Sequence, residues 1–234
     1  MGKTGKTVGI VQSSYIPWKG YFDLLRHTDE FILLDDVQFT KRDWRSRNRI
    51  KTPQGPLWLT IPLRVKGRYL QLIHETEISD PHWNQRHWLT LRAHYGRAPF
   101  FGAYKDALEE LFLGCTMTSL SHINHRLTLG LCRLLGIETK LSWSMDYGGS
   151  GSKTERLVAI CRQAGATHYL SGPTARCYLD EGVFATAGIP VTYFDYEGYP
   201  EYPQLHPPFD HHVSVIDLLV HTGPEALRFL ERQR

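Results

Sequence analysis

The first residues whose types could do chemistry follow a short apolar run, residues 8–12, that predicts a buried strand. The segment after it offers an amide, two hydroxyls, a lysine and aromatic rings, and its Pro17 and Gly20 break regular structure. Ligands of open parallel sheets bind beyond the carboxyl ends of the strands, so we expect a substrate-binding loop here. The alternative is a turn whose aromatic rings only cover the core. The candidate substrate-binding residues of this loop are Gln12, Tyr15, Trp18 and Lys19.

Two neighbouring acids, Asp35 and Asp36, end a second apolar run at residues 30–34. Carboxylates at the end of a strand can bind a cation, hold a ribose or act as a general base. Side chains of adjacent strand residues point to opposite faces, so we expect only one of the two acids to enter a site. Both are candidate catalytic residues, and the acid that stays outside would hold a loop or pair with Arg42.

A basic segment, residues 41–51, follows the acids and carries six cations and one acid. Arginine presents a fork of donors that suits phosphate or carboxylate, so this segment predicts an anion-binding site. The alternative is a solvated, salt-bridged loop. Lys41 joins the two acids as a candidate catalytic residue. The candidate substrate-binding residues of the segment are Arg45, Arg47, Asn48 and Arg49.

A glycine-rich segment, residues 148–154, precedes a predicted helix. It is not a phosphate-binding loop of the G-x-x-x-x-G-K-[ST] type, because Ser152 stands where that motif requires glycine. Free backbone amides at the start of a helix still favour an anion, which makes Lys153 and Thr154 candidate substrate-binding residues. The alternative is that Ser152 or Thr154 only caps the helix.

A third strand end, at residues 168–171, runs into a loop that contains Ser171 and Arg176. Ser171 does not lie in a G-x-S-x-G motif, so a hydrolase elbow is not indicated. We expect Ser171 to position a substrate and Arg176 to bind an anion.

Histidines gather near the C-terminus, where His206, Asp210, His211 and His212 lie close together in sequence. Adjacent residues such as His211 and His212 cannot easily face one ion in an extended chain, and no H-E-x-x-H spacing occurs. The four cysteines form no C-x-x-C pair, so a zinc knuckle or redox motif is not indicated either. We assign no metal ligand. The cofactor is unknown at this stage, and a nucleotide and Mg²⁺ are the candidates to test.

The order of the elements predicts an α/β fold with a mostly parallel central sheet of Rossmann-like, nucleotidylyltransferase-like type. We expect one domain over residues 8–234, with a β-hairpin and helical insertion over residues 52–135, and a flexible N-terminal segment over residues 1–7. The predicted strands are residues 8–12, 30–34, 56–63, 70–78, 137–143, 168–171 and 190–195. The predicted helices are residues 21–27, two helices within 83–113 that break near 97–99, then 120–135, 155–164, 178–187, 213–219 and 225–232.

The composition is that of an ordinary globular protein, with 41% hydrophobic residues, 22% charged residues and a net charge of +3. No stretch approaches the ~20 apolar residues that a membrane span needs, and no apolar signal core follows the polar N-terminus. We therefore expect a cytoplasmic protein without a membrane partner. The modest net charge argues against nucleic acid, although residues 41–51 alone would suit RNA or DNA. The expected partner is a phosphorylated or nucleotide-linked small molecule, and the oligomeric state is not indicated.

Five segments carry a family resemblance when they are taken together. They are GIVQSSYIPWKGYFDLL, DEFILLDDVQFTKRDWRSRNRIKTPQGPLWLTIPL, SKTERLVAICRQAGATHYLSGPTARCYLD, YPQL and VSVIDLLVHTGPEAL. From about residue 8 to residue 230, the chain resembles the WbqC-like family. The C-terminal stretch HPPFDHHVSVIDLL is richer in histidine than the family pattern, which argues against a family-wide metal role for those histidines.

The WbqC-like family occurs largely in bacterial gene clusters for O-antigen and other glycans, and in some natural-product clusters. The resemblance implies a setting in lipopolysaccharide or natural-product biosynthesis more firmly than it implies a reaction. Our first hypothesis is a transferase that acts on a nucleotide-linked or phosphorylated sugar or amine. N-acylation or aminoacylation is a candidate reaction. The alternative is a non-catalytic sugar-nucleotide-binding or accessory protein of a glycan cluster. In the transferase hypothesis the phosphates are held by Lys19, Arg45, Arg47, Arg49 and Lys153, the base or cation ligand is Asp35 or Asp36, and the acceptor is oriented by Gln12, Tyr15 and Ser171.

Overall fold

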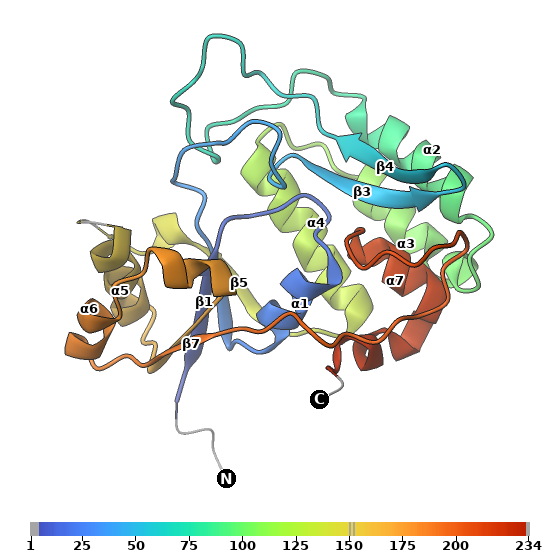
Figure 1. Cartoon of the computed structure of the whole chain (residues 1–234). Coiled ribbons are helices and arrows are strands. Elements are labelled where there is room, and N and C mark those ends of the chain that lie inside the picture. Colours follow the sequence, from blue (N-terminus) through green and yellow to red (C-terminus); the bar gives the residue numbers. More distant parts are fainter. Residues whose placement is uncertain (1–4, 150, 152, 233–234) are drawn as a thin grey trace. The chain divides into compact units, whose positions relative to one another are not determined.

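The computed structural model describes residues 5–149, 151 and 153–232 (Figure 1). Contacts divide the chain into two compact units, and each unit uses several chain segments. The first, the sheet unit, comprises the described residues of Met1–Gln12, Asp23–Asp36 and Glu138–Tyr196. The second, the hairpin unit, comprises those of Ser13–Phe22, Val37–Ile137 and Glu197–Arg234. The chain passes from one unit to the other within helix α1 (Lys19–Arg26).

Five parallel strands in the order β5-β2-β1-β6-β7 form the centre of the sheet unit. The strands are β1 (Thr7–Val11), β2 (Glu30–Leu33), β5 (Lys140–Trp143), β6 (His168–Ser171) and β7 (Val191–Tyr193). Strand β2 is buried along its whole length, as an apolar strand inside a parallel sheet should be. Strand β1 pairs with both β2 and β6, so the carboxyl ends of these three strands lie along one edge of the sheet.

Two helices share the core of this sheet. They are α5 (Lys153–Gln163) and α6 (Glu181–Thr186), and their apolar side chains pack with those of β1, β2 and β6. Tyr169 of β6 stacks on Phe184 of α6 with the ring centroids 4.9 Å apart. Asp180 caps α6 by accepting a hydrogen bond of 2.9 Å from the amide of Gly182. Two short 3₁₀ helices, η1 (Ser144–Asp146) and η2 (Pro173–Cys177), follow β5 and β6.

The hairpin unit contains the antiparallel strands β3 (Arg47–Thr52) and β4 (Gly55–Thr60) and several helices (Figure 1). The turn between the strands needs Gly55, whose φ of 103° lies in the left-handed region. Helix α2 (Trp83–Tyr95) fixes the hairpin, because the Tyr95 hydroxyl accepts a hydrogen bond of 2.9 Å from the amide of Lys51. The other helices of the unit are α3 (Phe101–Leu113), α4 (Leu120–Leu135), α7 (Val215–Thr222) and the 3₁₀ helix η3 (Gly223–Leu230).

Aromatic side chains dominate the core of the hairpin unit. Trp83, Trp88, Tyr95 and Phe112 are almost completely buried, and together they bury a large apolar area. None of the helices in the described part of the chain is long and apolar enough to cross a bilayer.

Most of the predicted elements are confirmed. Helix α4 and strand β6 have the predicted bounds, and the predicted pair of helices within 83–113 is present as α2 and α3. Gly136, with a φ of 72°, ends α4 in the left-handed conformation, which explains why glycine marked the end of this helix in the sequence. The structure therefore confirms an α/β fold with a parallel sheet and an additional antiparallel hairpin.

Two predictions about strands are wrong. Residues 70–78 form no strand: local hydrogen bonds, such as the one from the Leu72 amide to the Glu75 carboxylate, fold the segment into turns, and only isolated bridges remain. The strand β3 was missed, because its alternation of arginine and asparagine has no apolar period; pairing with β4 makes it a strand. The last helix also differs, since residues 223–230 are 3₁₀ rather than α-helical.

The domain prediction is not tested by the division into two units. One domain over residues 8–234, with an insertion over 52–135, stays a prediction. Within the predicted flexible segment 1–7, residues 1–4 lie outside the described residues. Thr7 already belongs to β1, and Lys6 donates a hydrogen bond of 2.6 Å to the Ala164 carbonyl.

Candidate functional site

The sheet unit has a topological switch point between β1 and β6. The chain leaves β1 toward β2 on one side, and the later strands β6 and β7 lie on the other side. Open α/β sheets bind ligands outside the carboxyl ends of the strands at such a point. Gln12 follows β1 and Ser171 ends β6, so two predicted substrate-binding residues lie at neighbouring strand ends. Ser171 is buried, and its hydroxyl donates a hydrogen bond of 3.3 Å to the Tyr169 hydroxyl.

The acid pair lies after β2, at the same edge of the sheet. Asp35 is completely buried. Asp36 accepts a hydrogen bond of 2.5 Å from the Ser144 hydroxyl and forms an ion pair with Arg156 of α5. The Asp36 carboxylate therefore connects the end of β2 with η1 and α5. These bonds position the acid, and they also occupy oxygens that a metal ion or a substrate proton would need.

Three more predicted residues of the sheet unit lie on or near α5 and η2. Lys153 is exposed at the start of α5. The Thr154 hydroxyl accepts a hydrogen bond of 3.2 Å from the Asp180 amide, which ties α5 to the start of α6. The Arg176 guanidinium lies 4.7 Å from the centroid of the Tyr193 ring. Ser150 and Ser152 of the glycine-rich segment lie outside the described residues.

In the hairpin unit, the loop that contains Tyr15 is an interior structure. Tyr15 is completely buried, and its hydroxyl lies 2.6 Å from Nδ1 of His87. Burial lowers the pKa of His87 to about 4, so the imidazole is neutral at pH 7 and its Nδ1 accepts a hydrogen bond from the Tyr15 hydroxyl. No motif indicates that these two residues pair, because they are separated by 72 positions in the chain. Tyr15 therefore supports the loop from inside.

Backbone strain occurs in the same loop, at Ile16. Its φ of 35° is in the left-handed region, which a β-branched residue rarely adopts and which costs about 1–3 kcal/mol. Asn48 holds this conformation, since its side-chain amide donates a hydrogen bond of 2.8 Å to the Ile16 carbonyl. Asn124, which sequence analysis missed, donates to the Ser13 hydroxyl at 3.0 Å and to the Arg45 carbonyl at 2.9 Å. Asn48 and Asn124 thus fix the loop and the start of β3 in one arrangement.

Lys19 is almost completely buried among aromatic rings. Its ammonium group donates a hydrogen bond of 3.1 Å to the Pro200 carbonyl. The centroids of the Tyr199, Tyr202 and Phe209 rings lie 5.1–5.7 Å from Nζ, within the range of cation–π attraction. The structure therefore places this predicted phosphate ligand where it stabilises the segment 199–209. Trp18, next to it, stacks on His212 with the ring centroids 5.7 Å apart.

The outward face of the hairpin carries the basic residues that stay accessible. Arg49 is paired with Trp58 across the two strands, and Arg47 lies two residues before it, on the same face. The Arg47 guanidinium lies 4.2 Å from the centroid of the Trp58 ring. Arg49 lies 5.7 Å from the same centroid and donates two hydrogen bonds, of 2.9 and 3.1 Å, to the His212 carbonyl.

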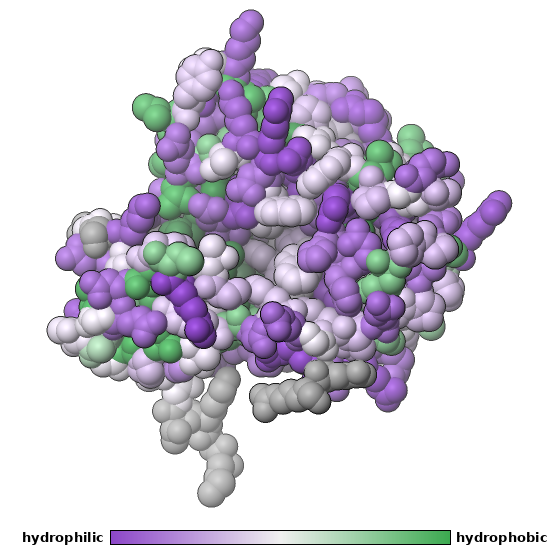
Figure 2. Space-filling model, in the orientation of Figure 1, coloured by the Kyte–Doolittle hydropathy of each residue, from purple (hydrophilic) through white to green (hydrophobic). Residues whose placement is uncertain are grey.

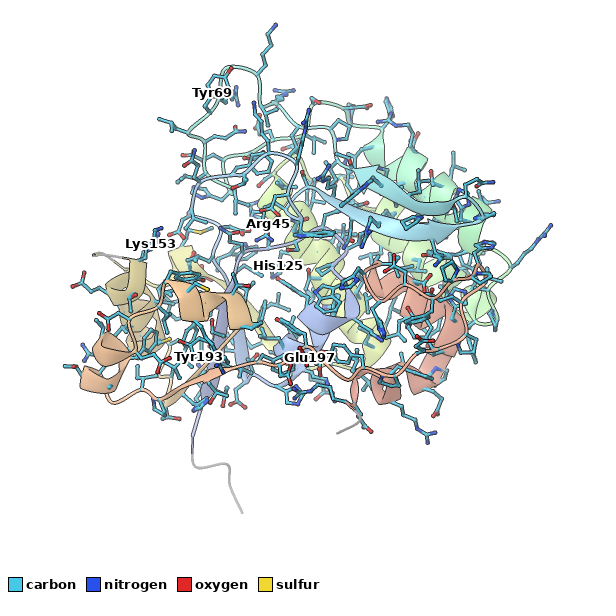
Figure 3. All side chains as sticks on the ribbon, viewed as in Figure 1. Arg45, Tyr69, His125, Lys153, Tyr193 and Glu197 are labelled. Atoms are coloured by element: carbon cyan, nitrogen blue, oxygen red, sulfur yellow. The ribbon has the colours of Figure 1, made fainter. Side chains whose placement is uncertain are left out.

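Arg47 has no anionic partner. Within the part of the chain that the structure describes, no acceptor takes a hydrogen bond from its side chain, and its Nε is buried without a partner. The surrounding residues 37–70 carry nine lysine or arginine residues and one aspartate. In Figure 2 hydrophilic side chains project around the loops that flank the hairpin, and Figure 3 shows Arg45 near the start of β3. This face is the strongest candidate anion-binding site in the hairpin unit.

A hollow between α3 and α4 is lined by other residues than those of the hairpin face. It has a volume of about 520 Å³ and is lined mainly by apolar parts of Leu111, Leu129 and Leu134. None of the predicted site residues lines it. Among the described residues, no three histidine, cysteine, aspartate or glutamate side chains are grouped as a metal ion would need.

Comparison with known proteins identifies the family. The model of the WbqC-like protein family matches residues 12–229. The chain belongs to the WbqC-like protein family. A protein of this kind from Mycobacterium tuberculosis (strain ATCC 25618 / H37Rv), named uncharacterized protein Rv1507c, is 51% identical over 225 residues, which cover 96% of this chain and 97% of the relative. No solved structure matches the chain. The WbqC-like match covers both units, so the sheet edge and the hairpin face both lie within the family region.

Proposed function

We propose that this WbqC-like protein is a transferase that acts on a nucleotide-linked or phosphorylated sugar or amine. The setting would be the biosynthesis of a bacterial surface glycan or a natural product. The observation that carries the proposal is Arg47: a guanidinium fixed against Trp58, without an anionic partner in the described residues, inside a strongly basic segment. A phosphate oxygen would supply the acceptor that the described residues do not supply.

The hairpin presents its arginines in a preorganised way, which supports binding of a charged group. Asn48 and Asn124 fix the backbone at both sides of Arg47, so little order has to be created when an anion binds. Hydrogen bonds between arginine and phosphate are charge-assisted and often bidentate, so Arg45 and Arg47 together suit a phosphate or pyrophosphate.

The sheet unit supports the transferase part of the proposal. Its strand order has the switch point of doubly wound, Rossmann-like sheets. This switch point supports the Rossmann-like, nucleotidylyltransferase-like type of sheet that we expect from the sequence. Gln12 and Ser171 would orient the acceptor, and Asp35 or Asp36 would serve as base or cation ligand. Lys41, which belongs to the hairpin unit, stays a further catalytic candidate. In an N-acyl or aminoacyl transfer, the acceptor nitrogen bonds to the carbonyl carbon of an activated donor. The bond from that carbon to the leaving group breaks, and a proton passes from the nitrogen to the base. A nucleotide or Mg²⁺ is the cofactor to test.

Titration calorimetry with sugar nucleotides and sugar phosphates tests the binding part. Arg47→Ala should weaken binding by about 2–4 kcal/mol if the guanidinium contacts a buried phosphate. Lys153→Ala, tested independently, should weaken binding by less, because Lys153 is exposed. Arg92→Ala, which removes an exposed arginine of α2, is the matched control and should bind as the wild type does. Unchanged affinity of both Arg47→Ala and Lys153→Ala contradicts the proposal.

A second function is favoured by one observation, the pairing of Asp36 with Arg156 and Ser144. A carboxylate used in this way can be purely structural, as in a non-catalytic sugar-nucleotide-binding protein. Asp35→Asn and Asp36→Asn, measured side by side for binding and for turnover, separate the two functions. A transferase loses turnover in at least one variant and keeps binding, whereas a binding protein shows no turnover and keeps binding in both.

A further inference from the structure

Trp44 of the basic segment and Trp58 of β4 form an exposed aromatic surface, here named the indole platform. Their ring centroids lie 5.4 Å apart with an interplanar angle of 36°. We propose that the indole platform stacks on the base of a nucleoside 5′-diphosphate, so that the ligand is nucleotide-linked and not merely phosphorylated. This inference rests on the proposed function and specifies its substrate class.

The exposure of these rings has no packing explanation. Trp44 is 42% and Trp58 is 41% exposed, whereas Trp83 and Trp88 of the same unit are 1% and 2% exposed. The unit can therefore bury indoles completely, yet it leaves these two beside each other in solvent. Adjacent exposed aromatic rings of this kind occur where a planar ligand stacks.

The indole platform is rigid, because the backbone below it is fixed at several points. The Trp44 carbonyl accepts a hydrogen bond of 2.9 Å from the Tyr15 amide, and the Trp44 amide donates one of 2.7 Å to the Asp43 carboxylate. Trp58 lies in β4, and Arg47 stacks on its ring. Stacking of a base here would therefore cost little conformational entropy in the protein.

Arg47, which has no anionic partner among the described residues, lies next to the indole platform and indicates the second part of the ligand. The Arg47 guanidinium lies 4.2 Å from the Trp58 centroid, so a phosphate and an aromatic ring could be bound side by side. In a nucleotide the ribose keeps the base and the 5′-phosphate only a few ångström apart. A nucleoside diphosphate carries both groups in one molecule, whereas pyrophosphate has no ring to stack.

A cation and an exposed aromatic ring also occur together at Lys41 and Tyr69, with Nζ 4.7 Å from the ring centroid. Tyr69 is 69% exposed at the tip of the loop after β4, where Figure 3 shows it pointing away from the hairpin. It has no second aromatic ring stacked against it in the described contacts of the hairpin unit. Tyr69 is therefore the matched control for the indole platform.

Calorimetry and quenching of tryptophan fluorescence with ADP, UDP, pyrophosphate, glucosamine 1-phosphate and a short single-stranded RNA test the inference. The wild type should bind at least one nucleoside diphosphate on the order of tenfold or more tightly than pyrophosphate. Trp44→Ala, which leaves the contact between Arg47 and Trp58 in place, should remove that advantage and leave pyrophosphate binding unchanged. Trp58→Leu should remove the advantage as well, but it also removes the ring against which Arg47 lies. Trp44→Phe should retain most of it, and Tyr69→Ala should retain all of it. Both tryptophans are at the surface, and melting temperatures near the wild-type value would show that the variants fold.

The outcomes separate the inference from the proposed function. If no phosphate-bearing compound binds the wild type, the proposed function fails, and the inference fails with it. If phosphate compounds bind but the nucleoside diphosphates have no advantage, or the tryptophan variants keep that advantage, the inference alone is overturned. If glucosamine 1-phosphate binds as tightly as the nucleoside diphosphates, the inference is overturned, and the result favours a sugar that stacks on the indole platform. Tight, strongly salt-dependent binding of the RNA without binding of ADP or UDP overturns it in favour of nucleic acid.

Discussion

Glu30 in the sheet unit and Arg47 in the hairpin unit are both charged strand residues, but only Glu30 finds its counter-charges within the described chain. The Glu30 carboxylate is completely buried and lies 2.6 Å from the Lys6 ammonium and 3.0 Å from that of Lys140. It also accepts a hydrogen bond of 2.5 Å from the Ser142 hydroxyl. Arg47 has an aromatic ring beside it and, in the part of the chain that the structure describes, no acceptor for its side chain. The charge of Glu30 therefore stabilises the fold, whereas the charge of Arg47 stays available for a ligand.

The largest expected effect concerns Glu30. Burial alone would raise its pKa, but hydrogen bonds to the carboxylate, first of all from Lys6, lower the pKa to about 2. Because this folded-state pKa lies below the ordinary 4.5, the contribution to stability is complete above pH 4.5 and is lost as the pH falls from 4.5 toward 2. The shift corresponds to about 3 kcal/mol.

Urea unfolding of the wild type and of Glu30→Gln at pH 7 and pH 3 measures this contribution. The variant should be less stable at pH 7 and should lose less stability on acidification than the wild type. Glu225→Gln, which removes an exposed acid paired with Arg228, is the control and should change stability by less than about 0.5 kcal/mol. Identical acid sensitivity of the wild type and Glu30→Gln would show that Glu30 is not neutralised in this way.

A smaller loss of stability is expected for Asp36→Asn than for Glu30→Gln, which changes another acid of the sheet unit. The side chains of Asp36 and Arg156 are 20% and 24% exposed, so the pair is only partly removed from water. Asp36→Asn should lower the free energy of unfolding by about 1–2 kcal/mol. A double-mutant cycle with Arg156→Met measures the coupling. A coupling near zero, combined with lost turnover, would instead assign Asp36 to catalysis.

The sequence predicted some parts of the fold and site better than others, for physical reasons. Helix α4 and strand β6 were predictable because periodicity and a terminal glycine or a short apolar run are local properties. The basic character of β3 was visible, but its strand conformation depends on pairing with β4. The indole platform depends on the same pairing, since Trp44 and Trp58 become neighbours only when the hairpin forms.

Burial was the property that the sequence could not provide. Tyr15 and Lys19 have the types of ligand-binding residues, yet the structure places both in the interior of the hairpin unit. They are covered by residues far along the chain, namely His87 for Tyr15 and the segment 199–209 for Lys19. Residue type and spacing carry no information about such distant partners.

The smallest expected effect is the change in stability caused by Arg47→Ala. This change tests whether Arg47, unlike Glu30, contributes little to the stability of the fold. The substitution removes a cation–π contact at a partly exposed site, worth about 0.5–1 kcal/mol, and it also relieves repulsion within a basic segment. We therefore expect the free energy of unfolding at pH 7 to change by less than about 1 kcal/mol in urea titrations, although ligand affinity falls. A loss as large as that of Glu30→Gln would mean that Arg47 supports the fold, as the charges of the sheet unit do. Arg47 would then not be available to bind an anion.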